Sequence, residues 1–353
     1  MLLDRNNNWI YDSNNFFLEG FSDSQLESLC HLKRTIKAPI FFWTTELYGF
    51  GKCYREWLGI SKYFPIPFYG DHGVDLTGIL HPHEKVNKSK FHLTFSKARY
   101  ENICNHKYKK LFYIKNPWVT YRNIKKIELK NTRIGTLLFF AHTNFGIDFE
   151  DENFDFYFKQ LEKLNEKFGP IVICLHPTDI KKGLHKKLRK YLYPIITAGD
   201  SLDPNFVDRF YEIIINFKQA TSNKIGSYIF YCTEIGLPFF LYGEAPMLIN
   251  KTDENIPIGD FSNFTPQLKQ FTIDIKKYFS DYSPIVTEEQ YQLTKITLGL
   301  DSVIDKKTLK CYFIVENIRL LPYYFYTVFK FLFFAFVNKC KSSAKSGPIE
   351  VIS

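Results

Sequence analysis

Polar residues suited to proton transfer or phosphate binding directly follow apolar runs of the chain. His176 and Pro177 come after Ile171–Leu175, and Glu244 comes after Pro238–Tyr242. A proline ends a strand and fixes the loop, so we expect the imidazole of His176 to point outward, where it can donate to a phosphate or a developing anion. A carboxylate at the position of Glu244 can accept hydrogen bonds from ribose hydroxyls.

A second candidate segment is Thr221–Ser227, which reads Thr-Ser-Asn-Lys-Ile-Gly-Ser. We expect it to begin a helix, with Thr221 or Ser222 as the N-cap. The free N–H groups and the positive dipole end of such a helix start bind anions, and Gly226 would let the backbone approach closely. Capping alone would also explain Ser222 without any ligand.

The third group, Asp71-His72-Gly73, follows the predicted strand Phe64–Tyr69. A carboxylate or an imidazole on a tight glycine loop would be exposed and rigidly placed, as a general base must be. The alternative is that Asp71 caps the following turn and His72 has no role.

The elements that must position these groups alternate between strand and helix. Buried strands that alternate with amphipathic helices predict parallel sheets, whose ligands lie outside the carboxyl ends of the strands. We therefore predict an α/β fold with two Rossmann-like domains facing across a cleft and helices at the C-terminus. The expected domains are residues 1–130, which carry the acceptor, residues 131–265, which carry the donor, and the C-terminal helices at 266–353, with a linker near Lys125–Arg133. The other predicted strands are Ala38–Thr44, Leu93–Phe95, Leu111–Ile114, Gly135–Ala141 and Pro194–Ala198, and the clearest predicted helices are Ser22–Lys33, Phe154–Phe168, Gln267–Tyr278 and Glu288–Leu298.

Composition and charge narrow the class of protein. At 353 residues the chain is long enough for two cores. A net charge of +9 suits phosphorylated ligands, anionic lipid or nucleic acid, but no nucleic-acid-binding motif occurs, so we expect no nucleic-acid partner. Seven widely spaced cysteines without a CxxC pair predict a reducing compartment and no zinc site. Because the N-terminus lacks a signal-peptide pattern, we expect a cytoplasmic protein.

No DxD pair of the kind that holds Mg²⁺ or Mn²⁺ in sugar transferases occurs in the sequence. The nearest approach is the acidic run Asp148–Glu152, which we interpret as compensation of the dipole of the following helix. We therefore expect no metal and no cofactor, with lysines and helix N–H groups replacing the cation.

The C-terminal segment Tyr323–Val337 is apolar and rich in aromatic residues, and it contains Lys330. Its 15 residues are fewer than the roughly 20 that a spanning helix needs. An aromatic helix flanked by lysines is typical of a helix lying in a membrane interface. The other interpretation is a helix that returns to cover the first domain, and the two are compatible.

Taken together, these motifs make the chain resemble the two-domain (GT-B) glycosyltransferases of bacterial surface polysaccharide synthesis, and especially the bacterial sialyltransferases and related Kdo transferases. Those families carry an acidic-x-Gly motif, a His-Pro motif and a Ser-Ser or Ser-Thr motif. The matching residues here are Asp71-His72-Gly73, His176-Pro177 and Thr221-Ser222. The resemblance implies that Asp71 is the base, that His176 assists the leaving nucleotide, and that the Thr-Ser pair holds the donor phosphate.

The first motif departs from that pattern, because His72-Gly73 is also similar to the His-Gly of the glycerol-phosphate and ribitol-phosphate polymerases, where histidine is the base. We therefore expect a metal-independent glycosyltransferase that moves a sugar from a nucleotide-sugar donor, CMP-linked donors among the candidates, to a surface polysaccharide or glycolipid. The alternatives are a CDP-polyol glycerophosphotransferase-like enzyme and a non-catalytic nucleotide- or carbohydrate-binding protein. Expected partners are the donor, a lipid-linked or oligosaccharide acceptor, and the inner face of the cell membrane through the C-terminus. The predicted catalytic residues are Asp71, His72 and His176, and the predicted donor-binding residues are His142, Thr143, Asn144, Pro177, Thr221, Ser222, Asn223, Gly226, Ser227 and Glu244.

Overall fold

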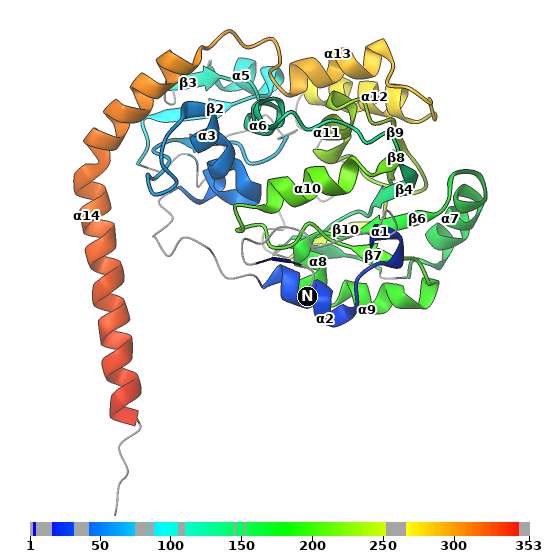
Figure 1. Cartoon of the computed structure of the whole chain (residues 1–353), viewed down its shortest axis with the longest axis horizontal. Helices are drawn as coiled ribbons and strands as arrows, with labels where there is room; N and C mark the ends of the chain where they lie inside the picture. The colour runs from blue at the N-terminus through cyan, green and yellow to red at the C-terminus, as the bar shows by residue number, and fades with distance from the viewer. Residues whose placement is uncertain are drawn as a thin grey trace, which may run out of the picture.

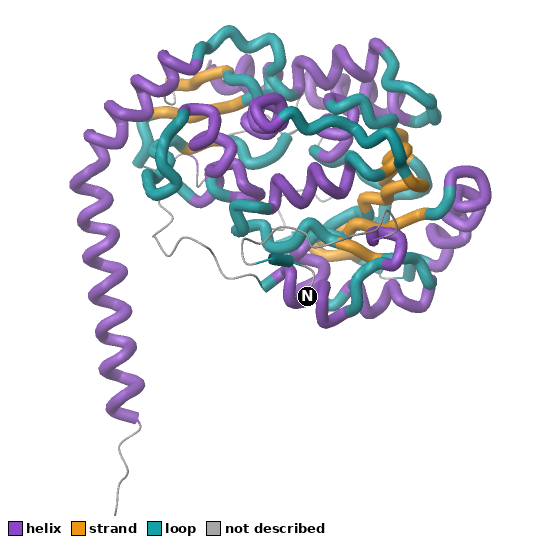
Figure 2. The backbone as a smooth tube through the Cα atoms, viewed as in Figure 1, coloured by secondary structure: helices purple, strands orange, loops and turns teal. Residues whose placement is uncertain are grey.

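The chain forms two parallel β-sheets, each flanked by helices (Figure 1; Figure 2). The structure is a computed structural model that describes residues 3–4, 16–31, 42–74, 84, 88–104, 110–144, 146–151, 153–251 and 266–345. The predicted α/β class with two parallel-sheet units is confirmed.

The larger sheet has five parallel strands in the order β7-β6-β4-β8-β9. Numbered along the chain this is 3-2-1-4-5, the strand order of a Rossmann fold. The strands are apolar because helices cover both faces of the sheet. They are β4 (Ile134–Phe139), β6 (Ile171–Cys174), β7 (Ile195–Ile196), β8 (Phe217–Ser222) and β9 (Phe239–Leu241), and the intervening helices are α7 (Asp155–Phe168), α8 (Pro177–Lys181), α9 (Leu184–Leu188), α10 (Phe206–Ile214) and α11 (Tyr228–Glu234).

The smaller sheet has three parallel strands in the order β1-β2-β3. Its strands are β1 (Tyr69–Gly70), β2 (Phe91–Thr94) and β3 (Lys110–Tyr113), and the helices of this unit are α3 (Phe50–Leu58), α5 (Lys97–Cys104) and α6 (Pro117–Lys125). A continuous buried apolar cluster joins the two units. At its centre the ring of Trp118 lies 5.7 Å from that of Phe50 and 4.9 Å from that of Phe210.

The N-terminal helices α1 (Phe16–Glu19) and α2 (Asp23–Cys30) lie against the larger sheet. The N–H of Phe21 donates to the carbonyl of Ile195, in strand β7, at 2.8 Å. Helix α2 begins with the capping box of Ser22 and Gln25, as the serine in the sequence predicted. The division of the chain at residues 130 and 265 stays a prediction.

Three helices follow the larger sheet: α12 (Pro266–Phe279), α13 (Glu288–Thr297) and α14 (Lys306–Lys345). The first half of α14 buries Leu309, Phe313 and Leu320 against the smaller unit. Within the segment Tyr323–Val337, Tyr324 is buried but Phe325 and Phe329 are exposed, so the interpretation that this segment covers the first domain is wrong for most of its described side chains. The second half runs on away from the body of the molecule (Figure 1). Among the described residues, no helix is long and apolar enough to cross a membrane.

Three local predictions are wrong. Thr221 and Ser222 do not begin a helix; they end strand β8, and α11 begins at Tyr228. Strand β8 does not show an apolar pattern, because hydrogen bonds inside the sheet satisfy its polar side chains. For example, the hydroxyl of Thr221 donates to the carbonyl of Phe240 at 2.8 Å.

In the acidic run Asp148–Glu152, the first carboxylate does not serve the dipole of α7. Asp148 lies in strand β5 (Ile147–Phe149), which pairs with β10 (Leu248–Asn250), and its carboxylate forms ion pairs with Lys182 and Lys251. At the predicted strand Ala38–Thr44, residues 38–41 lie outside the described residues, and Trp43–Thr45 form a 3-10 helix, η1.

Candidate functional site

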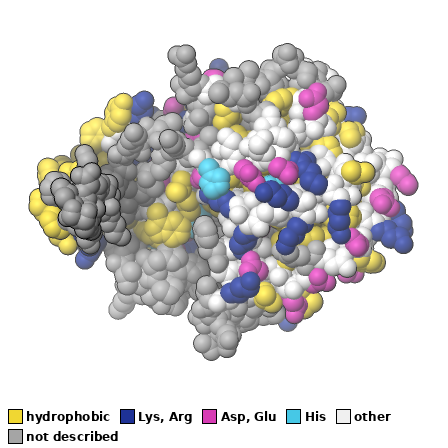
Figure 3. All heavy atoms as spheres, turned by 90° about the horizontal axis from the view of Figure 1, so that it is seen from below, with side chains coloured by type: hydrophobic (Ala, Val, Ile, Leu, Met, Phe, Trp, Pro, Cys, Tyr) yellow, Lys and Arg dark blue, Asp and Glu magenta, His cyan; other side chains and the backbone are white. Residues whose placement is uncertain are grey.

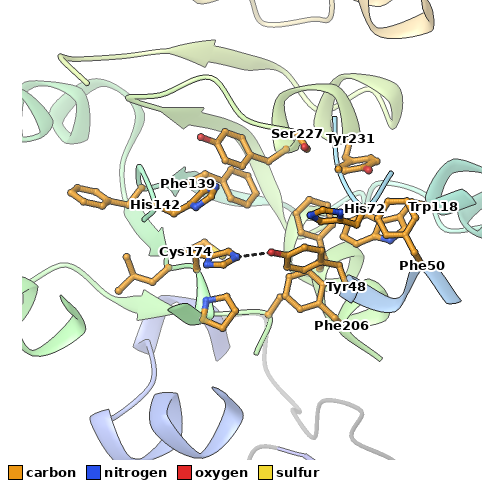
Figure 4. Close-up of a pocket in the computed structure, with 18 residues that line it drawn as sticks. Tyr48, Phe50, His72, Trp118, Phe139, His142, Cys174, Phe206, Ser227 and Tyr231 are labelled. Atoms are coloured by element: carbon orange, nitrogen blue, oxygen red, sulfur yellow. Dashed lines mark hydrogen bonds between the residues drawn. The ribbon is translucent and has the colours of Figure 1, made fainter. Parts of the chain in front are cut away.

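A cavity of about 160 Å³ lies between the two units, at the carboxyl ends of β1, β4 and β6 (Figure 4). The smaller unit contributes Tyr48, His72 and Trp118 to its lining, and the larger unit contributes His142 and His176. Most of the remaining wall is aromatic. Two of the three predicted catalytic residues, from separate motifs, therefore meet at one cavity, and Asp71 does not.

His176 follows strand β6 and is the N-cap of helix α8, with Pro177 at the first helical position. Its Nδ1 accepts from the N–H of Thr178 at 3.3 Å, and its Nε2 lies 3.0 Å from the hydroxyl of Tyr48. Burial, with a smaller effect of His142, holds the pKa of His176 well below its usual value. The ring is therefore neutral, and because Nδ1 is an acceptor, Nε2 carries the proton and donates to Tyr48.

His142 follows strand β4 and stacks on His176, with ring centroids 4.6 Å apart. Its Nδ1 lies 3.1 Å from the carbonyl of Thr143. Because a carbonyl can only accept, Nδ1 carries the proton and Nε2 is the acceptor. Burial lowers the pKa of His142, against the opposing effect of the Thr143 carbonyl. The pair thus offers one N–H donor and one ring acceptor, both uncharged.

The loops that carry these two histidines are joined by a buried carboxylate that the sequence did not reveal. Asp179 Oδ1 accepts from the backbone N–H of Thr143 at 3.0 Å and from its hydroxyl at 2.6 Å. Burial raises the pKa of Asp179 to about 6. The only sequence signal is its position three residues after His176, which places it inside the first turns of α8.

Asp71 is buried and not exposed, so this part of the prediction is wrong. Its carboxylate accepts from the hydroxyl of Thr94 at 2.6 Å, lies 3.2 Å from Nε2 of His92, and forms an ion pair with Nε of Arg99 at 3.1 Å. A buried carboxylate needs such partners, and those of Asp71 lie inside the smaller unit and not at the cavity. The neighbouring residue His72, not Asp71, reaches the cavity.

Asp71, Glu84 and His92 place potential metal-ligand atoms within 4.8 Å of one another. Arg99 contacts both carboxylates of this group, and all four side chains are buried. The guanidinium of Arg99 already provides a positive charge beside both carboxylates. We therefore describe the group as a buried ion-pair cluster that anchors the loop of His72.

The residues predicted to hold the donor phosphate are mostly engaged inside the protein. Ser222 Oγ accepts from the N–H of Lys224 at 3.0 Å, and Asn223 Oδ1 accepts from the N–H of Ala141 at 2.9 Å. Ser227 does line the cavity, and its hydroxyl accepts from the N–H of Val74 at 2.8 Å. That bond ties the loop after His72 to the start of helix α11.

Other predicted donor-binding residues lie away from the cavity wall. The side chains of Asn144 and Glu244 are exposed, and Thr143 is buried, with its hydroxyl donating to Asp179. Gly226 is half-buried, and a Cβ there would come within 2.5 Å of the ring of Tyr228. Of the predicted donor-binding residues, those that line the cavity are His142, Pro177 and Ser227.

Tyr48 is the lining residue that sequence reasoning missed. It lies in the 3-10 turn η2 (Leu47–Gly49), in a left-handed backbone conformation with φ of 53°, which is uncommon for a residue other than glycine. Nothing in the sequence of this turn indicates that the tyrosine reaches the other unit.

Comparisons with known proteins leave the family open. No family model and no curated protein matches the chain. Among solved structures, the UDP-GlcNAc 2-epimerase from Neisseria meningitidis bound to UDP-GlcNAc is 13% identical over 59% of this chain and 59% of that chain, with a TM-score of 0.32. Anabaena Alr3699/HepE in complex with UDP-glucose is 9% identical over 72% of each chain, with a TM-score of 0.30.

Proposed function

We propose that this protein is a glycosyltransferase that moves a sugar from a nucleotide-sugar donor to an acceptor hydroxyl. The observation that carries the proposal is the meeting of His72 with the stacked pair His142 and His176 across one cavity, at the carboxyl ends of strands from both sheets. In open parallel sheets, ligands bind at such strand ends.

In this proposal His72 takes the proton of the acceptor hydroxyl as its oxygen forms a bond to the anomeric carbon. The bond from that carbon to the donor phosphate breaks, and the phosphate leaves with the electron pair. The N–H at Nε2 of His176 then donates a hydrogen bond to the departing phosphate oxygen. Asp71 acts indirectly, because its buried contacts with Thr94 and Arg99 fix the loop that presents His72.

The reaction needs no metal in this scheme, since hydrogen-bond donors take the place of the cation at the phosphate. The cavity of about 160 Å³ is smaller than the 300–1,000 Å³ typical of ligand pockets. We therefore expect it to receive the reacting part of the donor, with the nucleoside at its mouth.

One observation favours a second candidate, a phosphotransferase that uses a CDP-linked polyol donor. His72 lines the cavity and Asp71 is buried behind it, so the base that we propose is a histidine, the residue type that the resemblance to the polyol-phosphate polymerases implies. The two candidates differ in their products. A glycosidic bond supports the first, and a phosphodiester supports the second.

We further propose that the protein is cytoplasmic and contacts the inner face of the cell membrane through helix α14, where it meets a lipid-linked or glycolipid acceptor. Beyond Tyr324 the helix exposes Phe325 and Phe329, at 72% and 71%, with further exposed aromatic side chains (Figure 3). Lysines follow in the sequence at 339, 341 and 345. Aromatic side chains beside lysines are typical of helices in anionic membrane interfaces.

Nucleotide binding is the first test. We expect at least one of CMP, CDP, UDP, GDP and ADP to raise the melting temperature, because a ligand that binds only the folded state stabilises it. The substitution His176→Ala should abolish the shift, and His31→Ala, at an exposed histidine outside the cavity, should retain it. A wild-type protein that none of the five nucleotides stabilises would contradict the proposal.

The catalytic role is tested separately with the nucleotide sugar that binds. We expect His72→Gln to keep the thermal shift and to lower transfer by about 100-fold or more, since general-base catalysis contributes 10²–10⁴-fold. Transfer at the wild-type rate in this variant would exclude His72 as the base.

A further inference from the structure

Tyr48 is fixed in place by contacts between the two units. Its N–H donates to the carbonyl of Ser201 at 2.6 Å. A Cβ on the next residue, Gly49, would lie 2.6 Å from the carbonyl oxygen of Pro204. Lys52, one turn further on, donates to Asp208 at 2.5 Å. The backbone that carries Tyr48 is therefore held tightly against the loop before α10.

The ring of Tyr48 lies between the two catalytic histidines of the proposed function (Figure 4). It stacks on His72 with centroids 6.3 Å apart, and it packs edge-on against Phe206 at 5.1 Å. Its hydroxyl points across the cavity to Nε2 of His176 at 3.0 Å. Burial raises the pKa of this phenol to about 12, so it is neutral at physiological pH.

His176 has a single ring proton to give. Its Nδ1 accepts from the N–H of Thr178, so the only ring N–H is at Nε2. The hydroxyl oxygen of Tyr48 accepts the hydrogen bond from this N–H. A phosphate oxygen that binds His176 needs the same proton. The phenol oxygen and the phosphate oxygen therefore exclude one another at this atom.

We propose that Tyr48 is a positioning residue that competes with the donor phosphate for the Nε2 proton of His176 and thereby sets the affinity for the donor. The inference rests on the proposed function, because it takes a nucleotide phosphate as the ligand of His176. Because the phenol oxygen lies on the axis of the ring, binding of the phosphate must move the whole ring of Tyr48 away from His176.

The substitution Tyr48→Phe removes the competing oxygen and keeps the ring. We expect calorimetry to show nucleotide binding about fivefold tighter, the equivalent of one net hydrogen bond. In the transfer reaction, KM for the donor should fall by about the same factor, with kcat within twofold of wild type. The probe is whichever of CMP, CDP, UDP, GDP and ADP stabilises the wild-type protein.

The matched control is Tyr242→Phe. This tyrosine does not line the cavity, and its hydroxyl donates to the carbonyl of Gln160 at 3.0 Å. We expect nucleotide affinity in this variant to stay within twofold of wild type. Unchanged or weaker binding in Tyr48→Phe, with Tyr242→Phe at wild-type affinity, would overturn the inference.

A ligand-free readout separates this inference from the proposed function. In protein labelled with ¹⁵N-histidine, the His176 signals, assigned with His176→Gln, should show the tautomer protonated at Nε2. Tyr48→Phe should shift them and speed exchange of that proton with water, and Tyr242→Phe should leave them in place. If no nucleotide binds the wild-type protein, the proposed function fails, and His176 signals that are identical in Tyr48→Phe and wild type overturn the inference by themselves.

Discussion

At the scale of single residues, Asp71 and His72 are neighbours with opposite surroundings. Asp71 pairs with Arg99 inside the smaller unit, and His72 faces the cavity. We expect Asp71→Asn to lower the free energy of unfolding by about 3 kcal/mol, because it removes one of the two buried carboxylates that pair with Arg99. His72→Gln should lower it by less than about 1 kcal/mol. Urea unfolding measures both, and equal losses would contradict this division of roles.

Asp179 gives a prediction for pH. Burial raises its pKa from 3.8 to about 6 in the folded protein. A raised pKa gives stability that is complete below the unfolded value and is lost as the pH rises through 6. Between pH 5 and pH 8, the wild type should therefore lose about 1–2 kcal/mol relative to Asp179→Asn.

Urea unfolding of the two proteins at both pH values measures this difference. The cost in stability of replacing the carboxylate by an amide does not depend on pH, so it cancels when the two pH values are compared. The exposed residue Asp281 supplies the control, since Asp281→Asn should show the same difference from wild type at both pH values. A difference for Asp179→Asn that does not change with pH would show that its carboxylate titrates normally.

At the scale of elements, the close approach of η2 to the larger unit depends on Gly49. Its φ is +78°, and a Cβ would lie 2.6 Å from the carbonyl oxygen of Pro204. Gly183 has a similar φ of +84°, but a Cβ there would meet none of the described residues within 4 Å beyond its own chain neighbours. Gly183→Ala should therefore cost about 1 kcal/mol of conformational strain.

Gly49→Ala should cost the same strain and, because the backbone must also move away from α10, at least about 2 kcal/mol more. Chemical denaturation of the two variants gives the comparison. Equal losses would mean that the two units are not packed closely at η2.

At the scale of the whole molecule, helix α14 has two halves with different roles. Truncation after Tyr324 should leave the melting temperature within about 2 °C of wild type, because the buried residues Leu309, Phe313 and Leu320 remain. It should also abolish co-sedimentation with phosphatidylglycerol vesicles, since the exposed aromatic residues are removed.

A second truncation, after Lys310, is the control for packing. It removes Phe313 and Leu320 as well and should lower the free energy of unfolding by several kcal/mol. Vesicle binding that survives truncation after Tyr324 would place the membrane contact elsewhere on the protein.

Much of the framework could be predicted from the sequence. The apolar runs that became β4, β6 and β9 and the amphipathic helix α7 follow from local patterning, because a strand buried on both faces must be apolar. The strand β8 could not be predicted in this way. Its Gln219 and Thr221 are polar, and only partners on neighbouring strands satisfy them.

The candidate site was predicted in part. His176 and His142 reach the cavity because each follows a strand, and strand ends in one parallel sheet meet at one edge. Asp71 was expected beside His72 in the site, but alternate residues after a strand point in different directions, and partners in β2 and α5 draw Asp71 inward.

The sequence by itself therefore determined the class of fold and the histidines that can do chemistry, since both depend on local pattern and on residue type. Only the tertiary structure decided which neighbour of each motif faces the cavity and which is buried. It also brought Tyr48 to His176 across 128 positions of sequence, through packing of η2 on the larger unit. Contacts of that kind depend on how two units dock, which no local pattern records.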